Sequence, residues 1–301
     1  MERLMDGGAS LIVSTQSANP FADDIVDFRQ MLINCKGLYE CPVNELGQPL
    51  GPLVGYAGTY KVADADFVAT NIPGRAGPLI NPPAVQHYVG LAYYNYSMAD
   101  QWPAVNRAFA RKLAENIRNV MDVPDVILGA PMAGIKLSSA LAEELGCRHI
   151  FAEKKVTVIG QGGQRDEEAL VLARYDIHPG DRVLIGEELV NNISSADKLI
   201  ELIEKAGGEY VGISCAINRS AQGLSQYQGK LIVSVLSVPT PQYRQDDPLV
   251  TNALKRGLEI IWKPKPAWDQ LKAAMDAARP SIDVRGNGET FFTLGGQKIE
   301  L

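Results

Sequence analysis

Between residues 123 and 238 the chain alternates short apolar runs with amphipathic stretches, and this alternation constrains its fold more than any other feature. The apolar runs, which resemble buried strands, are 123–128, 149–152, 182–186, 210–217 and 231–238. Amphipathic helices are expected between some of them, one over 134–145 that stops at Gly146 and one from Ser194 or Ser195 to Gly207. This repetition predicts an α/β fold with a doubly wound, mostly parallel sheet.

The pattern changes on both sides of this region, which suggests three parts. Residues 1–100 are rich in Gly, Pro, Asn and Tyr and indicate loops and short strands, one of them over Gln86–Tyr96. The α/β core, 101–238, begins with an amphipathic helix over Trp102–Met121. Residues 239–301 start with a proline-rich stretch and carry short helices, and we expect them to form an appendage packed on the core.

Parallel sheets bind ligands at the carboxyl ends of their strands, so loops 129–134 and 186–195 are the expected sites of chemistry. Gly129-Ala-Pro-Met-Ala-Gly134 follows a strand and opens a helix, where free backbone N–H groups suit a phosphate or pyrophosphate. A P-loop is disfavoured because Ile135 separates Gly134 from Lys136. A tight turn that binds no ligand remains the alternative.

The second loop carries two carboxylates and then a polar helix start. Glu187 and Glu188 suit sugar hydroxyls, and the Asn191–Ser195 run suits a 5′-phosphate held by backbone N–H groups and side chains. Two acidic residues in a loop are often only solvated, but a phosphate loop at the same sheet edge points to a split site for a phosphorylated sugar. The segment from Glu153 to Glu168 is long, charged and glycine-rich, typical of a mobile lid or of a solvated hairpin.

Three runs in this order resemble the type I phosphoribosyltransferases, and among them the orotate phosphoribosyltransferases. The runs are DVILGAPMAGIKLSSALAEELG, FAEKK with the GQGG lid, and DRVLIGEELVNNISSADKLIELIEKAGGEYVGISCAINR. The resemblance covers about residues 123–220, with a weaker match at YVGLAYYNY. It implies that residues 1–100 form a hood over the substrate base.

The resemblance also implies an activity, the transfer of ribose 5-phosphate from phosphoribosyl pyrophosphate with Mg²⁺ to a pyrimidine-type base, orotate first among them. No metal ligand is expected in the protein, because Mg²⁺ is carried by the substrate. The implied catalytic residues are Lys154, Glu187 and Glu188. The implied substrate-binding residues are Ala130, Pro131, Met132, Ala133 and Gly134 for pyrophosphate, Asn191, Asn192, Ile193, Ser194 and Ser195 for the 5′-phosphate, and Arg219, Tyr93 and Tyr94 for the base.

Two segments depart from the family pattern. Glu187-Glu188 and Asn191-Asn192-Ile193 stand where Glu-Asp or Asp-Asp and then Thr-Thr-Gly are typical, and Ile lacks the freedom of glycine at positive φ. In the lid, Glu153 replaces an arginine, and a second lysine and a histidine are missing, which removes cations from the pyrophosphate site. The alternatives are therefore a catalytically degenerate protein of this fold with a nucleotide-binding, regulatory or structural role, or a changed reaction such as hydrolysis.

Charge and composition exclude several other functions. The 301-residue chain has a formal net charge of −6, which disfavours nucleic acid as a partner. It has no apolar run long enough for a membrane span and no basic, apolar leader at its start, so a cytoplasmic location is expected. Its four cysteines form no CxxC pair, which disfavours a zinc site. A homodimer is expected from the resemblance.

Overall fold

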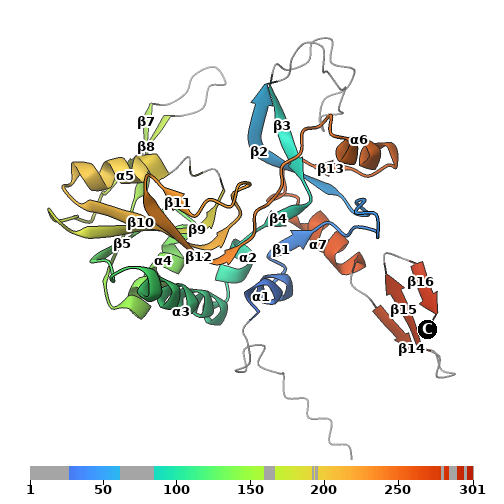
Figure 1. Cartoon of the computed structure of the whole chain (residues 1–301), viewed down its shortest axis with the longest axis horizontal. Helices are drawn as coiled ribbons and strands as arrows, with labels where there is room; N and C mark the ends of the chain where they lie inside the picture. The colour runs from blue at the N-terminus through green and yellow to red at the C-terminus, as the bar shows by residue number, and fades with distance from the viewer. Residues whose placement is uncertain are drawn as a thin grey trace, which may run out of the picture.

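The computed structural model describes residues 27–61, 85–158, 167–191, 193, 196–278, 281–284, 290–294 and 297–300. An α/β lobe and a second lobe lie side by side (Figure 1). The second lobe, called the hood here, contains β1 to β4 together with elements from the C-terminal part of the chain. No helix in these ranges is long and apolar enough to cross a membrane.

The α/β lobe contains a six-stranded sheet, which confirms the predicted α/β class. Its strands run in the order β11-β12-β10-β9-β5-β6, and all of them are parallel except β11. Their bounds are β5 Val126–Gly129, β6 Arg148–Phe151, β9 Arg182–Val190, β10 Glu209–Asn218, β11 Gln226–Tyr227 and β12 Lys230–Ser237. The strand order reverses between β5 and β9, so the loops after these two strands open at the switch point of the sheet.

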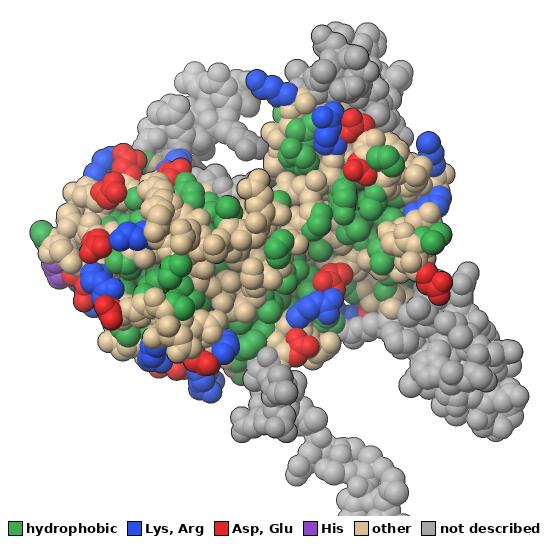
Figure 2. Space-filling model, in the orientation of Figure 1, with side chains coloured by type: hydrophobic (Ala, Val, Ile, Leu, Met, Phe, Trp, Pro, Cys, Tyr) green, Lys and Arg blue, Asp and Glu red, His purple; other side chains and the backbone are tan. Residues whose placement is uncertain are grey.

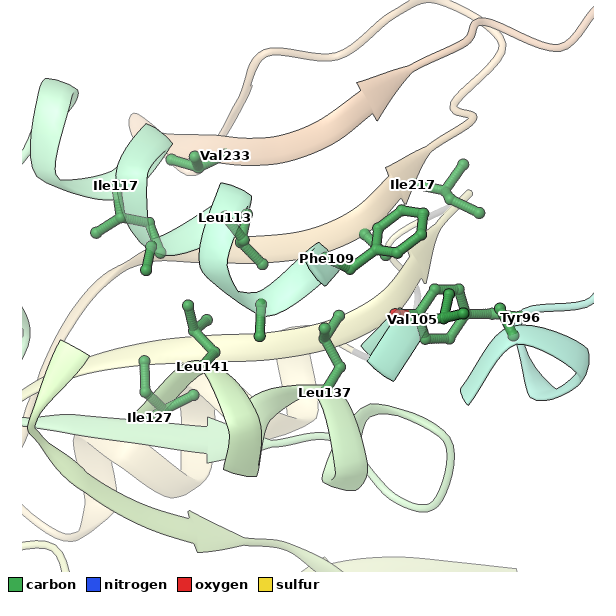
Figure 3. Packing of buried hydrophobic residues seen from close by; sticks show 14 of the residues in the cluster. Tyr96, Val105, Phe109, Leu113, Ile117, Ile127, Leu137, Leu141, Ile217 and Val233 are labelled. Carbon is green, nitrogen blue, oxygen red and sulfur yellow. The ribbon is translucent and has the colours of Figure 1, made fainter. Parts of the chain in front are cut away.

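Alternate residues of the strands face two different helical layers. Ile127 and Leu184 pack under α3 (Pro103–Val120) and α4 (Gly134–Leu145), and Figure 3 shows Ile127 beside Leu141 of α4. Leu128 and Ile185 point to the opposite face, under α5 (Ala196–Lys205). Each fully buried side chain of this size contributes about 1.5–3 kcal/mol to folding, so both layers hold the switch point rigidly.

The described N-terminal part of the chain supplies four strands in two antiparallel pairs and two helices, whose buried residues Met31, Leu32 and Ala99 pack in the core of the α/β lobe. These elements are α1 Phe28–Asn34, β1 Leu38–Glu40, β2 Leu53–Lys61, β3 Val85–Gly90, β4 Ala92–Tyr94 and α2 Ser97–Asp100. The strand expected over Gln86–Tyr96 is divided, because β3 pairs with β2 whereas β4 pairs with β1. Tyr93 and Tyr94 of β4 line a cavity together with Glu188, and the Tyr93 ring also packs against Trp268 of the C-terminal region.

The described part of the C-terminal region contributes to the hood. Its elements are α6 Pro248–Lys255, β13 Ile260–Ile261 and α7 Trp268–Ala277, followed by a small antiparallel sheet of β14 Ser281–Val284, β15 Thr290–Leu294 and β16 Gln297–Glu300. β13 pairs in parallel with β2, through Ile260 opposite Leu53 and Ile261 opposite Val54. The sequence predicts packing on the α/β core, but α6, β13 and α7 share their buried clusters with residues of the hood.

Between β6 and β9 the chain forms a two-stranded antiparallel hairpin, the lid hairpin, of β7 Glu153–Val158 and β8 Glu167–Val171. It stands out from the α/β lobe in Figure 1. Figure 2 shows that most charged side chains on this face lie at the rims of the lobes, whereas the middle, where the lobes meet, is mostly hydrophobic or uncharged. A cavity lined by residues of both lobes lies between them.

Candidate functional site

A small chamber of about 460 Å³ opens where the loops after β5 and β9 meet. Its lining consists of Pro131, Met132, Ala133, Lys154, Glu187, Glu188, Leu189 and Lys265. The chamber thus brings together the loop after β5, the lid hairpin, the acidic pair of β9 and a lysine from the C-terminal region. Its charged groups are two carboxylates and two ammonium groups, which suits a ligand that carries both phosphate and hydroxyl groups.

A backbone hydrogen bond to β9 holds the loop after β5 in place. The N–H of Ala130 donates to the carbonyl oxygen of Gly186 at 2.9 Å, so this donor is already used. At Gly134 a Cβ atom would lie 2.6 Å from the same carbonyl oxygen, which explains why a glycine begins α4. Met132, at the top of the loop, is 80% exposed. The loop therefore presents residues 131–133 to the chamber, and residues 130 and 134 support them.

Glu187 and Glu188 lie within β9, which continues to Val190 because it pairs with β10 along this length. Both residues are half-buried. Burial raises the pKa of the Glu188 carboxyl above its ordinary value, while a hydrogen bond with Glu187 and the positive charge of Lys265 oppose this shift. The acidic pair therefore lies in a partly dry environment next to a cation.

A larger chamber of about 640 Å³ lies between the acidic pair and the hood. The residues lining it are Gly55, Tyr56, Ala57, Val85, Gln86, His87, Tyr93, Tyr94, Asn95, Tyr96, Ser97, Glu188, Leu189, Asn191, Arg219, Gln245, Trp262, Lys263, Pro264, Lys265 and Pro266. Six of these residues carry an aromatic ring, namely Tyr56, His87, Tyr93, Tyr94, Tyr96 and Trp262. A planar ring would find flat apolar surfaces here, with polar groups at their edges.

Arg219 is the buried cation of the large chamber, with 4% exposure. Its backbone N–H donates to the carbonyl oxygen of Val190 at 2.9 Å, which fixes the residue next to the end of β9. Its Nε atom has no hydrogen-bond partner among the residues that the structure describes. A buried guanidinium donor in a cavity wall favours a ligand that carries an anionic or carbonyl oxygen.

The two chambers share Glu188, Leu189 and Lys265 as lining residues, so they meet at the acidic pair. A ligand that fills both would place a phosphate-bearing group near residues 131–133 and a ring near Arg219. The carboxylate of Glu188 would then lie beside the bond that joins the two groups. Such an arrangement suits a reaction in which positive charge develops at that bond.

The amino-acid sequence of the chain is similar to that of known enzymes. It is 32% identical over 121 residues to orotate phosphoribosyltransferase from Caldanaerobacter subterraneus subsp. tengcongensis, a match that covers 40% of this chain and 57% of the relative. It is 32% identical over 122 residues to orotate phosphoribosyltransferase from Thermus thermophilus, with 40% and 61% covered. The central part of this chain resembles the orotate phosphoribosyltransferases. It spans less than two thirds of these relatives' length.

Solved structures also align with the chain. UMP synthase from Leishmania donovani aligns at 19% identity and a TM-score of 0.43, over 83% of this chain and 41% of that one. Adenine phosphoribosyltransferase from Thermoanaerobacter pseudethanolicus aligns at 16% identity and a TM-score of 0.39, over 49% and 88%. No protein-family model matches the chain.

Most residues expected from the likeness to orotate phosphoribosyltransferases lie in one of the two chambers. The small chamber contains Pro131, Met132, Ala133, Lys154, Glu187 and Glu188, and the large one contains Tyr93, Tyr94, Asn191 and Arg219 as well as Glu188. Burial raises the pKa of Tyr94 to about 12. Lys136 is ion-paired with Asp100 at 3.4 Å and is absent from the lining of the small chamber, in line with the exclusion of a P-loop.

The loop expected to bind a 5′-phosphate is described only in part, since Asn192, Ser194 and Ser195 lie outside the described residues. Ile193 adopts a φ of 52°, in the left-handed region, and its side chain is 8% exposed within the cluster under α5. Ile193 thus adopts the positive φ that isoleucine is expected to resist, and burial of its side chain offsets the strain.

Sequence reasoning did not assign the residues that the C-terminal region brings to the site. Trp262 and Lys265 line the chambers, although their segment is more than forty residues beyond Arg219 in the chain. The pattern Trp262-Lys-Pro-Lys-Pro-Ala-Trp268 was the available clue, since two tryptophans and two prolines indicate an anchored, stiff segment. Tyr56 and His87 were also missed, because short hood strands give no periodic pattern.

Proposed function

We propose that this chain is a phosphoribosyltransferase that transfers ribose 5-phosphate from phosphoribosyl pyrophosphate to a pyrimidine-type base, with orotate as the leading candidate. The observation that carries the proposal is the meeting of two chambers at Glu188. One chamber has a helix-start loop and lysines, which suit a pyrophosphate. The other has aromatic walls and a buried arginine, which suit a planar base with an acidic substituent.

In the proposed reaction the bond between the anomeric carbon and a pyrophosphate oxygen breaks, and its electron pair leaves with the pyrophosphate. A ring nitrogen of the base forms the new bond to that carbon and gives up its proton. Glu187 and Glu188 would bind the ribose hydroxyls and stabilise the positive charge that develops on the ribose. Lys154 would neutralise charge on the leaving pyrophosphate, and Arg219 would bind the base through oxygen atoms at its edge.

Magnesium enters this proposal as part of the substrate. The described residues contain no group of three or more His, Cys, Asp and Glu side chains that could hold a resident metal ion. Pyrophosphate oxygens bind Mg²⁺ well, and the carboxylates of Glu187 and Glu188 are oxygen donors at the wall of the same chamber. The residues present therefore fit a magnesium ion that arrives with the substrate.

Calorimetric titration with phosphoribosyl pyrophosphate and Mg²⁺, followed by an orotate assay on the same sample, tests the proposal. We expect micromolar binding and release of pyrophosphate when orotate is added. Lys154→Ala should weaken binding at least tenfold, because its side chain lines the small chamber, whereas the exposed Lys155 does not and Lys155→Ala serves as the matched control. No binding at millimolar ligand would refute the proposal.

A second candidate function is favoured by Ile193. Its side chain lies where the resemblance expects a glycine beside a phosphate, and it fills space at the start of α5. A protein of this fold that binds a nucleotide or phosphoribosyl pyrophosphate without transferring the sugar would tolerate such a change. Binding of phosphoribosyl pyrophosphate without turnover on orotate, uracil or other pyrimidines would select this function. The proposed homodimer is checked by sedimentation of the same sample.

A further inference from the structure

The segment Trp262–Trp268, called the arch here, crosses from the hood to the acidic pair. It leaves β13 at Trp262 and enters α7 at Trp268. Between these residues, Lys263, Pro264, Lys265 and Pro266 all line the large chamber, and Lys265 also lines the small one. The arch therefore contacts both halves of the proposed site.

Both ends of the arch are anchored on the hood. A Cβ atom on Gly55 would overlap the Trp262 ring, so this ring lies directly against the β2 backbone. The Trp268 indole N–H donates to the carbonyl oxygen of Lys36 at 3.1 Å, and its ring centre lies 5.8 Å from that of Tyr93. Within the arch the Ala267 N–H donates to the carbonyl oxygen of Lys263 at 3.1 Å, and the two prolines restrict φ. The backbone of Lys265 is thus held in place before any ligand binds.

Lys265 carries its charge to the boundary between the chambers. Its side chain is exposed to the cavity and solvent, and its positive charge acts on the carboxyl of Glu188. Residues 131–133 also line the small chamber. An ammonium group at this point faces the space that the phosphate-bearing end of a ligand would fill.

Among the described residues of the lid hairpin, one cation lines the small chamber. This cation is Lys154, and Glu153 at the start of β7 is ion-paired with Arg174 at 3.2 Å. Pyrophosphate carries several negative charges, and its departure needs cations close to the oxygen that leaves. Lys154 together with the two carboxylates gives the chamber a net charge of −1, and Lys265 brings it to zero.

We propose that Lys265 of the arch binds the pyrophosphate group of the substrate and supplies positive charge from the hood side, in addition to that of Lys154. This inference rests on the proposed function. It makes the C-terminal region a part of the site, and it assigns the Trp-Lys-Pro-Lys-Pro-Ala-Trp pattern to the presentation of one ammonium group. Lysine suits this task because its compact charge has three donors that adapt to phosphate oxygens.

The test compares Lys265→Ala with Lys255→Ala in the 301-residue chain. Lys255 is an exposed lysine in the last turn of α6 and lines neither chamber, so it controls for a general loss of positive charge. We measure the affinity for magnesium pyrophosphate and for phosphoribosyl pyrophosphate by calorimetry, with thermal unfolding to verify the fold. Lys265→Ala should weaken both affinities at least tenfold, Lys255→Ala should change them less than twofold, and Lys265→Arg should retain most of the binding.

The outcomes separate this inference from the proposed function. If the wild-type chain binds both ligands and Lys265→Ala binds them equally well, the assignment of Lys265 is wrong and the proposed function stands. Equal losses in the two alanine variants would also overturn it, since they would indicate a general electrostatic effect. If the wild-type chain binds neither ligand at millimolar concentration, the proposed function itself fails.

Discussion

The guanidinium carbon of Arg219 lies 4.6 Å from the centre of the Tyr56 ring. Tyr56 is itself held by a hydrogen bond from its hydroxyl to the carbonyl oxygen of Ala92 at 2.5 Å. The ring of a β2 residue thus supports a cation that follows β10, and the two lobes of the molecule meet in this contact. Stacking leaves the edge of the guanidinium available for a ligand in the plane of its N–H groups.

Arg219→Met should weaken ligand binding without lowering the stability of the folded protein. Charge-assisted hydrogen bonds contribute about 1.5–3 kcal/mol each, so the affinity for an acidic pyrimidine should fall at least tenfold. The free energy of unfolding should stay level or rise, because a buried guanidinium with an unpaired Nε atom is removed. Arg244→Met is the matched control, since Arg244 stacks on Tyr60 at 4.9 Å and is absent from the chamber lining. Equal loss of affinity in both variants would contradict the role of Arg219.

Glu188 should make the stability of the protein depend on pH. Burial raises its pKa in the folded state above the ordinary value near 4.5. Its contribution to stability is therefore complete below the unfolded-state pKa and is lost as the pH rises through the elevated folded-state value. Glu188→Gln cannot ionise, so its unfolding free energy relative to wild type should increase between pH 4.5 and pH 8 in urea titrations.

Glu201 is the control for this prediction, because its pKa is shifted in the opposite direction from that of Glu188. The exposed carboxylate of Glu201 accepts a hydrogen bond from Lys205 at 2.6 Å, which lowers its pKa. Its small contribution is present above the unfolded-state pKa and is lost as the pH falls through the folded-state value. Glu201→Gln should therefore be relatively most destabilising at the higher pH. A Glu188→Gln variant with the same trend would contradict the assigned shift.

Patterns within short stretches of sequence predicted most of the α/β lobe. The strands and helices of the α/β lobe follow from apolar periodicity, and the meeting of loop 129–134 with Glu187 and Glu188 follows from the rule for the edges of parallel sheets. The length of β9 beyond Gly186 could not be predicted, because pairing with β10 extends it across two charged residues.

The position of the arch depends on a contact that no local pattern reveals. Ile260 pairs with Leu53, about two hundred residues earlier in the chain, and this pairing places the start of the arch beside β2. The two-residue strand is too short to be recognised from periodicity. The sequence shows a stiff segment flanked by two tryptophans, but it does not reveal that this segment lies beside the acidic pair.

Gly55→Ala should displace the arch. The added methyl group would overlap the Trp262 ring, and overpacking of this kind costs about 1–3 kcal/mol. Because Trp262 lines the large chamber, we also expect weaker binding of the base and a change in tryptophan fluorescence. Thr59→Ala, at an exposed position of the same strand, should change stability by less than about 0.5 kcal/mol. Unchanged stability in Gly55→Ala would show that Trp262 does not pack tightly there.

Two substitutions at Ile193 distinguish the cost of its strained backbone from the cost of losing its buried side chain. Ile193→Ala and Ile193→Gly both lose the buried side chain, a loss of about 2–5 kcal/mol. At a φ of 52° alanine keeps the left-handed penalty of about 1–2 kcal/mol, and glycine does not. We therefore expect the glycine variant to be more stable than the alanine variant by about 1 kcal/mol in urea unfolding. At Ile200, buried inside α5, the order should reverse, because glycine costs about 1 kcal/mol relative to alanine in a helix. If the alanine variant is the more stable one at both positions, the backbone of Ile193 is not strained.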